Sequence, residues 1–125
     1  MNRRSNSPRR TLELKADKLW QETVMLKWKG RCAFNDNHTA SCGHHIIGRA
    51  NKSTRHKLMN GIALSHKRHV WADEHHAEFV EWLEKDYPLL AAWHESNRNL
   101  PPRPRHLDDI RMDIAMLHQA IRDMV

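Results

Sequence analysis

Histidines and basic residues dominate the middle of this 125-residue chain. His44 and His45 are adjacent and open a short apolar run, a pattern that predicts a strand. Neighbouring residues on a strand point to opposite faces of the sheet, so one imidazole can bind a metal ion while the other faces a substrate. Between residues 37 and 72 the chain has no Asp or Glu. An anionic partner would meet only positive charge there, and a nucleic-acid backbone is the simplest such partner.

The candidates for phosphate contact are the cations of this segment and of the N-terminus. Arg49 and Arg55 are favoured most, because no acidic residue lies near them in the sequence. The first ten residues are rich in arginine and poor in apolar side chains, so we expect a flexible basic tail that is either solvated or lies on phosphates. A net charge of +6 and a pI of about 9.7 agree with nucleic-acid binding. The full set of candidates is Arg49, Lys52, Arg55, Lys57, Lys67, Arg68, Arg3 and Arg4.

The helices and strands that must position these residues are predicted from the periodicity of apolar side chains and from the residues that favour turns and helix ends. A helix is expected from Thr11 to about Lys29, with its tryptophans in the core. Residues 45–48 and 61–64 read as two short strands joined by a long polar connection, an antiparallel hairpin. The following helix, over residues 66–76, would place His69 and Asp73 at i and i+4 on one face. The fold class expected is therefore α+β, mostly helical, with the hairpin packed between flanking helices.

The C-terminal part of the chain carries one apolar seam. It follows a proline-rich linker that begins at residue 97 and consists of Leu107, Ile110, Ile114, Leu117, Ile121 and Met124. The seam must be buried, either against the helix that carries Phe79 and Leu83 or against a second copy of the chain. We favour fold-back and a monomer. The organisation expected is a tail over residues 1–10, a central domain over 11–96, and a linker with a terminal helix over 97–125.

Three separated stretches resemble the HNH (ββα-metal) endonucleases, in particular the small free-standing enzymes of bacteriophages. They are His44-His45-Ile46-Ile47-Gly48-Arg49, Asn60-Gly61-Ile62-Ala63-Leu64 and His69, which match in order and spacing. The resemblance covers roughly residues 30 to 76. It implies a ββα fold that binds a metal ion and cleaves DNA.

The resemblance also implies residue roles. His44, His69 and Asp73 correspond to the metal ligands, with His75 or His76 as alternatives to Asp73. His45 corresponds to the general base that accepts a proton from water, a role that suits an imidazole with an ordinary pKa near 6.5. Asn60 corresponds to the residue whose hydrogen bonds hold the His45 ring in orientation.

The ion implied is a single divalent cation per site. Cellular abundance favours Mg²⁺, while imidazole ligands favour Mn²⁺, Ni²⁺ or Zn²⁺. Relatives often carry a structural zinc bound by two Cys-x-x-Cys pairs, but most of those cysteines are missing here, so we expect none. A replacement zinc site is the alternative to two ordinary thiols, and it would use Cys32, His38, Cys42 and His66.

We therefore predict a metal-dependent endonuclease that acts on DNA, most simply a phage-encoded nicking enzyme in the host cytoplasm. No apolar run approaches the roughly 20 residues of a spanning helix, so no membrane association is expected. One rival is a non-catalytic DNA-binding module on the same scaffold, a regulator or packaging accessory. Another is a single-stranded nucleic-acid binder that stacks bases on its tryptophans.

Overall fold

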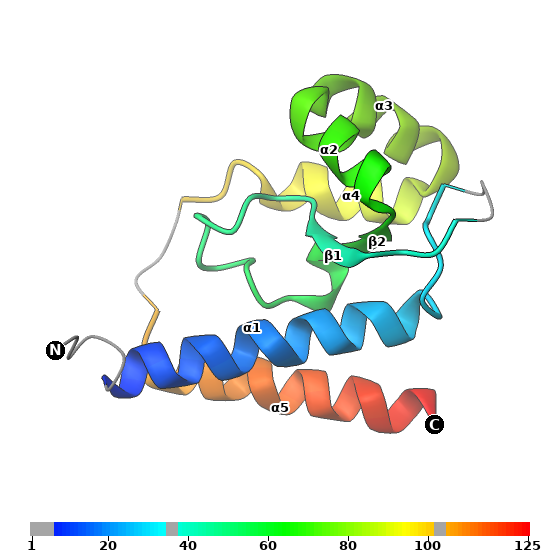
Figure 1. The fold of residues 1–125 in the computed structure, drawn as a ribbon. Coiled ribbons are helices and arrows are strands. Elements are labelled where there is room, and N and C mark those ends of the chain that lie inside the picture. The colour runs from blue at the N-terminus through cyan, green and yellow to red at the C-terminus, as the bar shows by residue number, and fades with distance from the viewer. Residues whose placement is uncertain (1–6, 35–37, 102–104) are drawn as a thin grey trace, which may run out of the picture.

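A computed structural model describes residues 7–34, 38–101 and 105–125. Two long helices, α1 (Pro8–Lys27) and α5 (Leu107–Met124), lie side by side beneath a small sheet, and three shorter helices lie above it (Figure 1). The sheet has two antiparallel strands. The fold class is therefore α+β and mostly helical, as expected from the sequence. Within the described residues, no helix is both long and apolar enough to span a membrane.

Helix α1 begins earlier than the apolar pattern indicated. The Ser7 side chain accepts a hydrogen bond from the backbone N–H of Arg10, and Pro8 occupies the first helical turn, where its missing N–H has no cost. The last part of the expected 1–10 tail is therefore helical. The helix ends at Lys27, two residues before the expected end, and after the capping residue Trp28 both Lys29 and Gly30 adopt positive φ angles, of 56° and 67°.

The apolar seam of α5 packs on α1. Ile110, Ile114 and Leu117 form one buried cluster with Ala16, Leu19, Trp20 and Val24 of α1 and Ala63. The expectation that the seam folds back within its own chain agrees with this contact. The prediction that the seam packs on the helix that carries Phe79 and Leu83 was wrong. That helix already buries both side chains in a different cluster, whereas α1 offers a long apolar face.

The strands are β1 (Cys42–His45) and β2 (Gly61–Leu64), paired so that His44 lies opposite Ile62 and His45 opposite Gly61. The second strand is as predicted, but the first lies earlier than the expected 45–48. The strand pairing ends at His45, because beyond it the Asn60 side chain, and not a strand backbone, binds Ile47. Asn60 Oδ1 accepts from the Ile47 N–H, and Asn60 Nδ2 donates to the Ile47 carbonyl. On the outer edge of β1, Gln21 of α1 bonds both backbone groups of Gly43.

The sheet separates two hydrophobic clusters. Ile62 and Leu64 face the upper cluster, which contains Phe79 and Leu83, while Ala63 faces α1. The upper helices are α2 (His66–Glu74), α3 (His76–Asp86) and α4 (Pro88–Asn97). A long loop over residues 46–60, which we call the inter-strand loop, joins β1 to β2 and ends in a short 3-10 helix, η2 (Leu58–Asn60).

Candidate metal centre

His44, His69 and Asp73 come together beside the sheet. One ligand atom from each lies within 4.8 Å of the others, so the group could hold a metal ion. The Nδ1 atoms of the two histidines are 2.9 Å apart, and an Asp73 oxygen lies 3.3 Å from His69 Nε2. This trio is the metal-ligand set implied by the resemblance.

Two elements position the group. His44 is on β1, where its ring is buried against Phe79 with a centroid distance of 5.3 Å. His69 and Asp73 are one helical turn apart on α2, whose first turn is capped by Ser65. The side chains become more exposed from His44 to Asp73, which is 59% exposed. The group therefore opens to solvent on the α2 side.

Burial sets the protonation state of His44. Removal from water disfavours the charged imidazolium and, with the nearby His69, lowers the pKa of His44 to about 4, although Asp73 opposes this shift. His44 is therefore neutral at pH 7. A neutral imidazole keeps the lone pair that binds a cation.

His45 projects from the opposite face of β1, toward α1. Its ring stacks on the Trp20 indole at a centroid distance of 3.8 Å and an interplanar angle of 8°. His45 Nε2 lies 3.0 Å from the Arg55 carbonyl oxygen. A carbonyl only accepts, so Nε2 carries the hydrogen, and in the neutral ring Nδ1 retains its lone pair. Burial lowers the pKa of His45 to about 4, against the opposing effect of this hydrogen bond, so the neutral ring is the form present at pH 7.

The Asn60 side chain is fully buried, and its hydrogen bonds go to backbone groups of the loop and not to the His45 ring. Besides Ile47, its Nδ2 donates to the Thr54 carbonyl at 3.1 Å. The resemblance implied that Asn60 orients the ring; its hydrogen bonds instead order the inter-strand loop, which includes the Arg55 carbonyl. Any effect of Asn60 on His45 is therefore indirect.

The structure separates the candidate phosphate-binding cations into groups. Arg55 and Lys57 have carboxylate partners, because Arg55 binds Asp17 at 2.7 Å and Lys57 Nζ lies 2.7 Å from Asp113. Arg49 is 61% exposed and 3.3 Å from Asp17. Sequence proximity was thus a poor guide to pairing, since both acids come from distant helices. The others are Lys52 and Lys67 on the surface, Arg68 with its guanidinium over the Phe34 ring at 4.3 Å, and Arg3 and Arg4, which lie outside the described residues.

The alternatives left open by the sequence do not gather into a ligand group. Across the described segments, the sole cluster of three or more metal-binding side chains is His44, His69 and Asp73. Cys32, His38, Cys42 and His66 form no such cluster there. The expected helix over residues 66–76 is interrupted, since His75 caps the end of α2 and His76 starts α3, and neither histidine belongs to the group.

Two residues near this centre were not identified from the sequence as functional. Trp20 was expected only in the core. The apolar periodicity of α1 predicts that Trp20 is buried, but it does not predict that the His45 ring stacks on Trp20. Asp17 lies about one turn before Trp20 on α1, and its partners Arg55 and His56 are far away in the chain. No local signal could have found either contact.

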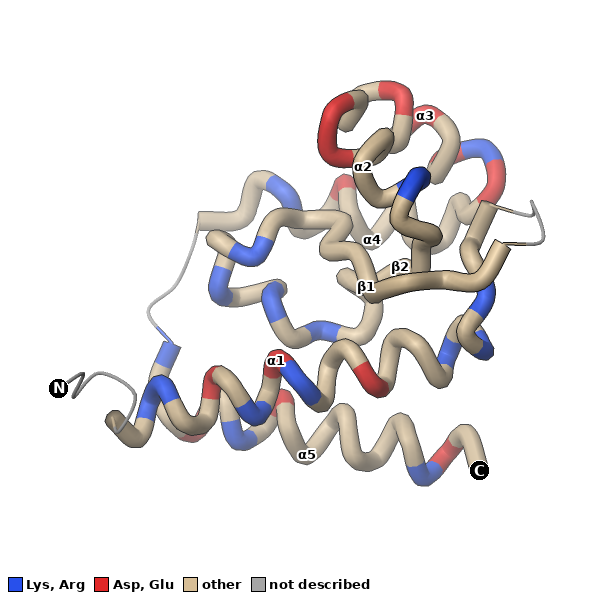
Figure 2. The backbone as a smooth tube through the Cα atoms, viewed as in Figure 1, with Lys and Arg blue, Asp and Glu red and all other residues tan. Residues whose placement is uncertain are grey.

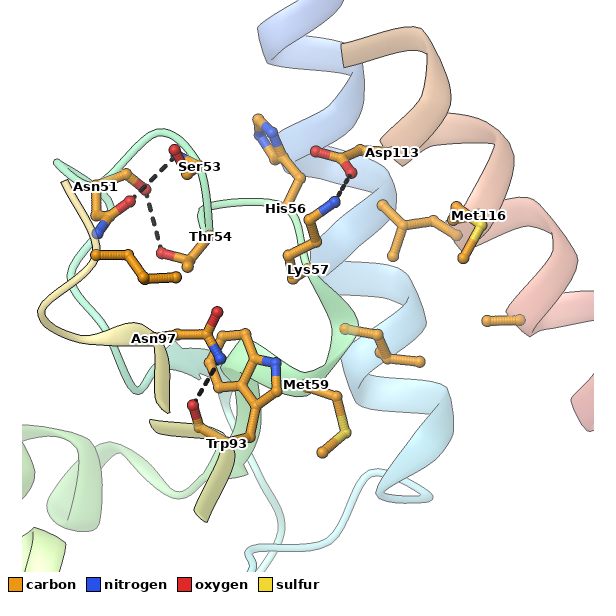
Figure 3. Close-up of a pocket in the computed structure, with 14 residues that line it drawn as sticks. Asn51, Ser53, Thr54, His56, Lys57, Met59, Trp93, Asn97, Asp113 and Met116 are labelled. Carbon is orange, nitrogen blue, oxygen red and sulfur yellow. Dashed lines mark hydrogen bonds and ion pairs between the residues drawn. The ribbon is translucent and has the colours of Figure 1, made fainter. Parts of the chain in front are cut away.

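A separate cavity of about 370 Å³ lies between the inter-strand loop, α4 and α5 (Figure 3). Its walls include Thr54, Trp93 and Met116, and none of the proposed catalytic or metal-binding residues contributes to it. The metal group is thus at the surface and not in this cavity.

Comparison of the chain with protein-family models, curated proteins and solved structures gave no match.

Proposed function

We propose that this protein is a metal-dependent endonuclease of the HNH type that hydrolyses phosphodiester bonds in DNA. The observation that carries the proposal is the pairing of a three-residue metal-ligand group with an oriented, neutral histidine at the next position of the same strand. A site with an imidazole base beside an open cation site has the two parts that phosphodiester hydrolysis requires.

The ligand set fits a catalytic ion. Two imidazoles and one carboxylate leave coordination positions for phosphate oxygens and water, as a catalytic site requires. A bound divalent cation supplies charge neutralisation at the scissile phosphate and at the leaving 3′ oxygen. Mg²⁺ and Mn²⁺ are the ions we propose, with Ni²⁺ and Zn²⁺ as the alternatives that imidazole donors accept.

His45 acts as the general base in this proposal. Its Nδ1 lone pair accepts the proton of the attacking water, while Nε2 remains bonded to the Arg55 carbonyl. Stacking on Trp20 restricts rotation of the ring. General-base assistance of this kind contributes roughly 10²- to 10⁴-fold to the rate.

The surroundings suit a polymeric substrate. The ligand group is open to solvent on the side of Asp73, and Lys52, Lys67 and Arg49 lie on exposed positions of the inter-strand loop and α2. A phosphate backbone could contact several of these cations at once, which a small anion could not. The basic residues Arg3 and Arg4 would add to this attraction.

Incubation of supercoiled plasmid with the protein and Mg²⁺ or Mn²⁺ tests the proposal. We expect relaxed circles, because one active site per monomer cuts one strand; linear product would indicate paired cuts. Addition of EDTA should stop the reaction. Intact plasmid with both ions, although the protein shifts DNA on a gel, would contradict the nuclease and favour the non-catalytic binding module.

Two substitutions separate the roles. His45→Ala should lower the cleavage rate by about 100-fold or more while Mn²⁺ binding, measured by calorimetry, is retained. His44→Ala should lose both DNA cleavage and Mn²⁺ binding. His118→Ala is the matched control, because His118 is exposed on α5, which lies on the other side of α1 from the sheet (Figure 1). Loss of Mn²⁺ binding in His45→Ala would overturn the assignment of His45 as base.

A further inference from the structure

We infer that the C-terminal segment belongs to the active centre, because Arg105 and Asp113 clamp the inter-strand loop and thereby position His45. These two residues are called the C-terminal clamp below. The inference rests on the proposed function, since it concerns the orientation of the proposed base. Neither residue touches the metal group, so both are positioning residues.

The Arg105 side chain connects the inter-strand loop to α5. Its Nη1 donates to the Lys52 carbonyl at 3.0 Å and lies 3.0 Å from His56 Nδ1. Its Nη2 donates to Asp113 Oδ2. The side chains of Arg105 and Asp113 are only 7% and 3% exposed. The guanidinium fork therefore binds two points of the loop to α5, away from water.

Asp113 uses its second oxygen for a further contact with the loop. Its Oδ1 accepts from Lys57 Nζ at 2.7 Å, at the edge of the cavity shown in Figure 3. The C-terminal clamp therefore reaches the loop at three positions, Lys52, His56 and Lys57.

His56 extends the clamp to α1. Arg105 can only donate, so His56 Nδ1 accepts, and the neutral ring carries its hydrogen on Nε2. Nε2 lies 2.6 Å from Asp17 Oδ1 and donates to it. The same carboxylate binds the Arg55 side chain. The loop is thus fixed between α1 on one side and the C-terminal clamp on the other.

The clamped residues are those that hold His45. Arg55, directly before His56, supplies the carbonyl that binds His45 Nε2 at 3.0 Å. The Lys57 carbonyl accepts a hydrogen bond from Trp20 Nε1 at 2.9 Å, and the Trp20 indole stacks on the His45 ring. A shift of residues 55–57 would therefore disturb both contacts of that ring.

The chemistry of the clamp favours a positioning role over a purely stabilising one. A buried ion pair gains little net stability compared with apolar side chains of similar size, because both charges must leave water. The ion pair does, however, impose one geometry, since the planar guanidinium fork binds its partners only in fixed directions. Two charges buried at this place are better explained by the geometry that they impose.

Arg105→Lys tests the inference. Lysine retains the positive charge beside Asp113 but, as a single ammonium group, cannot bond His56, Lys52 and Asp113 in the same arrangement. We expect kcat for plasmid cleavage to fall about tenfold or more, with KM changed less than about twofold, since the base is displaced and DNA contacts are retained. Arg111→Lys is the matched control, because Arg111 pairs with Asp108 on the exposed face of α5.

The second measurement is nuclear magnetic resonance of ¹⁵N-histidine-labelled protein without metal at pH 7.5. A hydrogen-bonded Nε2 proton of His45, assigned by its loss in His45→Ala, should be visible in the wild type and in Arg111→Lys. It should be lost or strongly weakened in Arg105→Lys. If Arg105→Lys does not fold, as judged by circular dichroism, the double variant Arg105→Met with Asp113→Leu is measured by the same two methods.

The outcomes separate the two proposals. A folded clamp variant with wild-type kcat and an unchanged His45 proton would overturn the clamp while leaving the nuclease intact. An equal loss in Arg111→Lys would also overturn it. If wild-type protein cleaves no DNA, the proposed function fails, and the His45 proton still decides whether the clamp positions that ring.

Discussion

His44 and His45 are chain neighbours with opposite surroundings. His44 is buried against Phe79 and faces the α2 ligands, whereas His45 stacks on Trp20 of α1. This difference follows directly from strand geometry, in which successive side chains alternate between the two faces of a sheet. Metal binding and base chemistry can therefore be assigned to two adjacent residues without steric conflict.

Gly61 is required for the close approach of α1. A Cβ at this position would lie 2.3 Å from Val24 Cγ2 and 2.9 Å from Trp20 Cζ2. Gly61→Ala should therefore lower the free energy of unfolding by about 1–3 kcal/mol, measured by urea denaturation. Gly48→Ala is the control, since a Cβ there meets nothing within 4 Å. Equal effects of the two substitutions would contradict the close packing.

Asp17 should stabilise the fold in a pH-dependent manner. Burial favours its neutral form, but hydrogen bonds from His56 and Arg55 outweigh burial and lower its pKa from the usual 3.8 to about 2. The stabilisation is complete above pH 3.8 and is lost as the pH falls toward 2, because the folded state then gains a proton less readily than the unfolded state. The contribution is about 2 kcal/mol.

Urea denaturation of wild type and Asp17→Asn between pH 7 and pH 3 measures this contribution. The difference in unfolding free energy should be constant from pH 7 to about pH 5 and shrink below pH 4. Asp108→Asn, at a position whose side chain is 93% exposed, should show a much smaller difference. A difference that grows on acidification would contradict a lowered pKa.

At the scale of elements, the contact of α5 with α1 sets the position of the C-terminal clamp. Leu117 is 2% exposed within this contact, whereas Met112 on the same helix is 61% exposed. Leu117→Ala should cost about 2–5 kcal/mol of unfolding free energy, and Met112→Ala less than about 0.5 kcal/mol. Thermal or urea denaturation measures both. Equal, small losses would show that the α5 seam is not buried in solution.

Across the described residues, acidic and basic side chains are unevenly distributed, although both occur along α1 and α5. Acidic residues are frequent along α2 and α3, while the inter-strand loop is basic, as is the start of α1 (Figure 2). The acids of α2 and α3 are Asp73, Glu74, Glu78, Glu81, Glu84 and Asp86. A DNA backbone would be repelled by α3 and attracted to the loop, so the proposed substrate approaches from the loop side.

DNA binding should depend strongly on salt. Each phosphate contact contributes a slope of roughly −0.9 to log K against log salt concentration. Because α1 is capped by Ser7, deletion of residues 1–6 removes Arg3 and Arg4 without removing the cap. Fluorescence anisotropy at several salt concentrations should show a slope reduced by one to two contacts. An unchanged slope would mean that the N-terminal arginines do not touch DNA.

The local elements could be read from the amino-acid sequence alone. The second strand, the helix that starts at His66, and the i, i+4 spacing of His69 and Asp73 all depend on nearest neighbours in the chain, although the expected 66–76 helix ends at Glu74. Periodicity and capping residues therefore predict them. The adjacent histidines likewise implied two faces, because side chains alternate along any strand.

Only the tertiary structure decided which distant residues meet. The end of β1 at His45 depends on Asn60, the destination of the α5 seam depends on the free face of α1, and the partners of Arg55 and Lys57 are Asp17 and Asp113. Each depends on packing between segments far apart in sequence, which no local pattern records. A seam specifies that burial is needed, but the partner surface is specified by the rest of the fold, because hydrophobic association is non-directional.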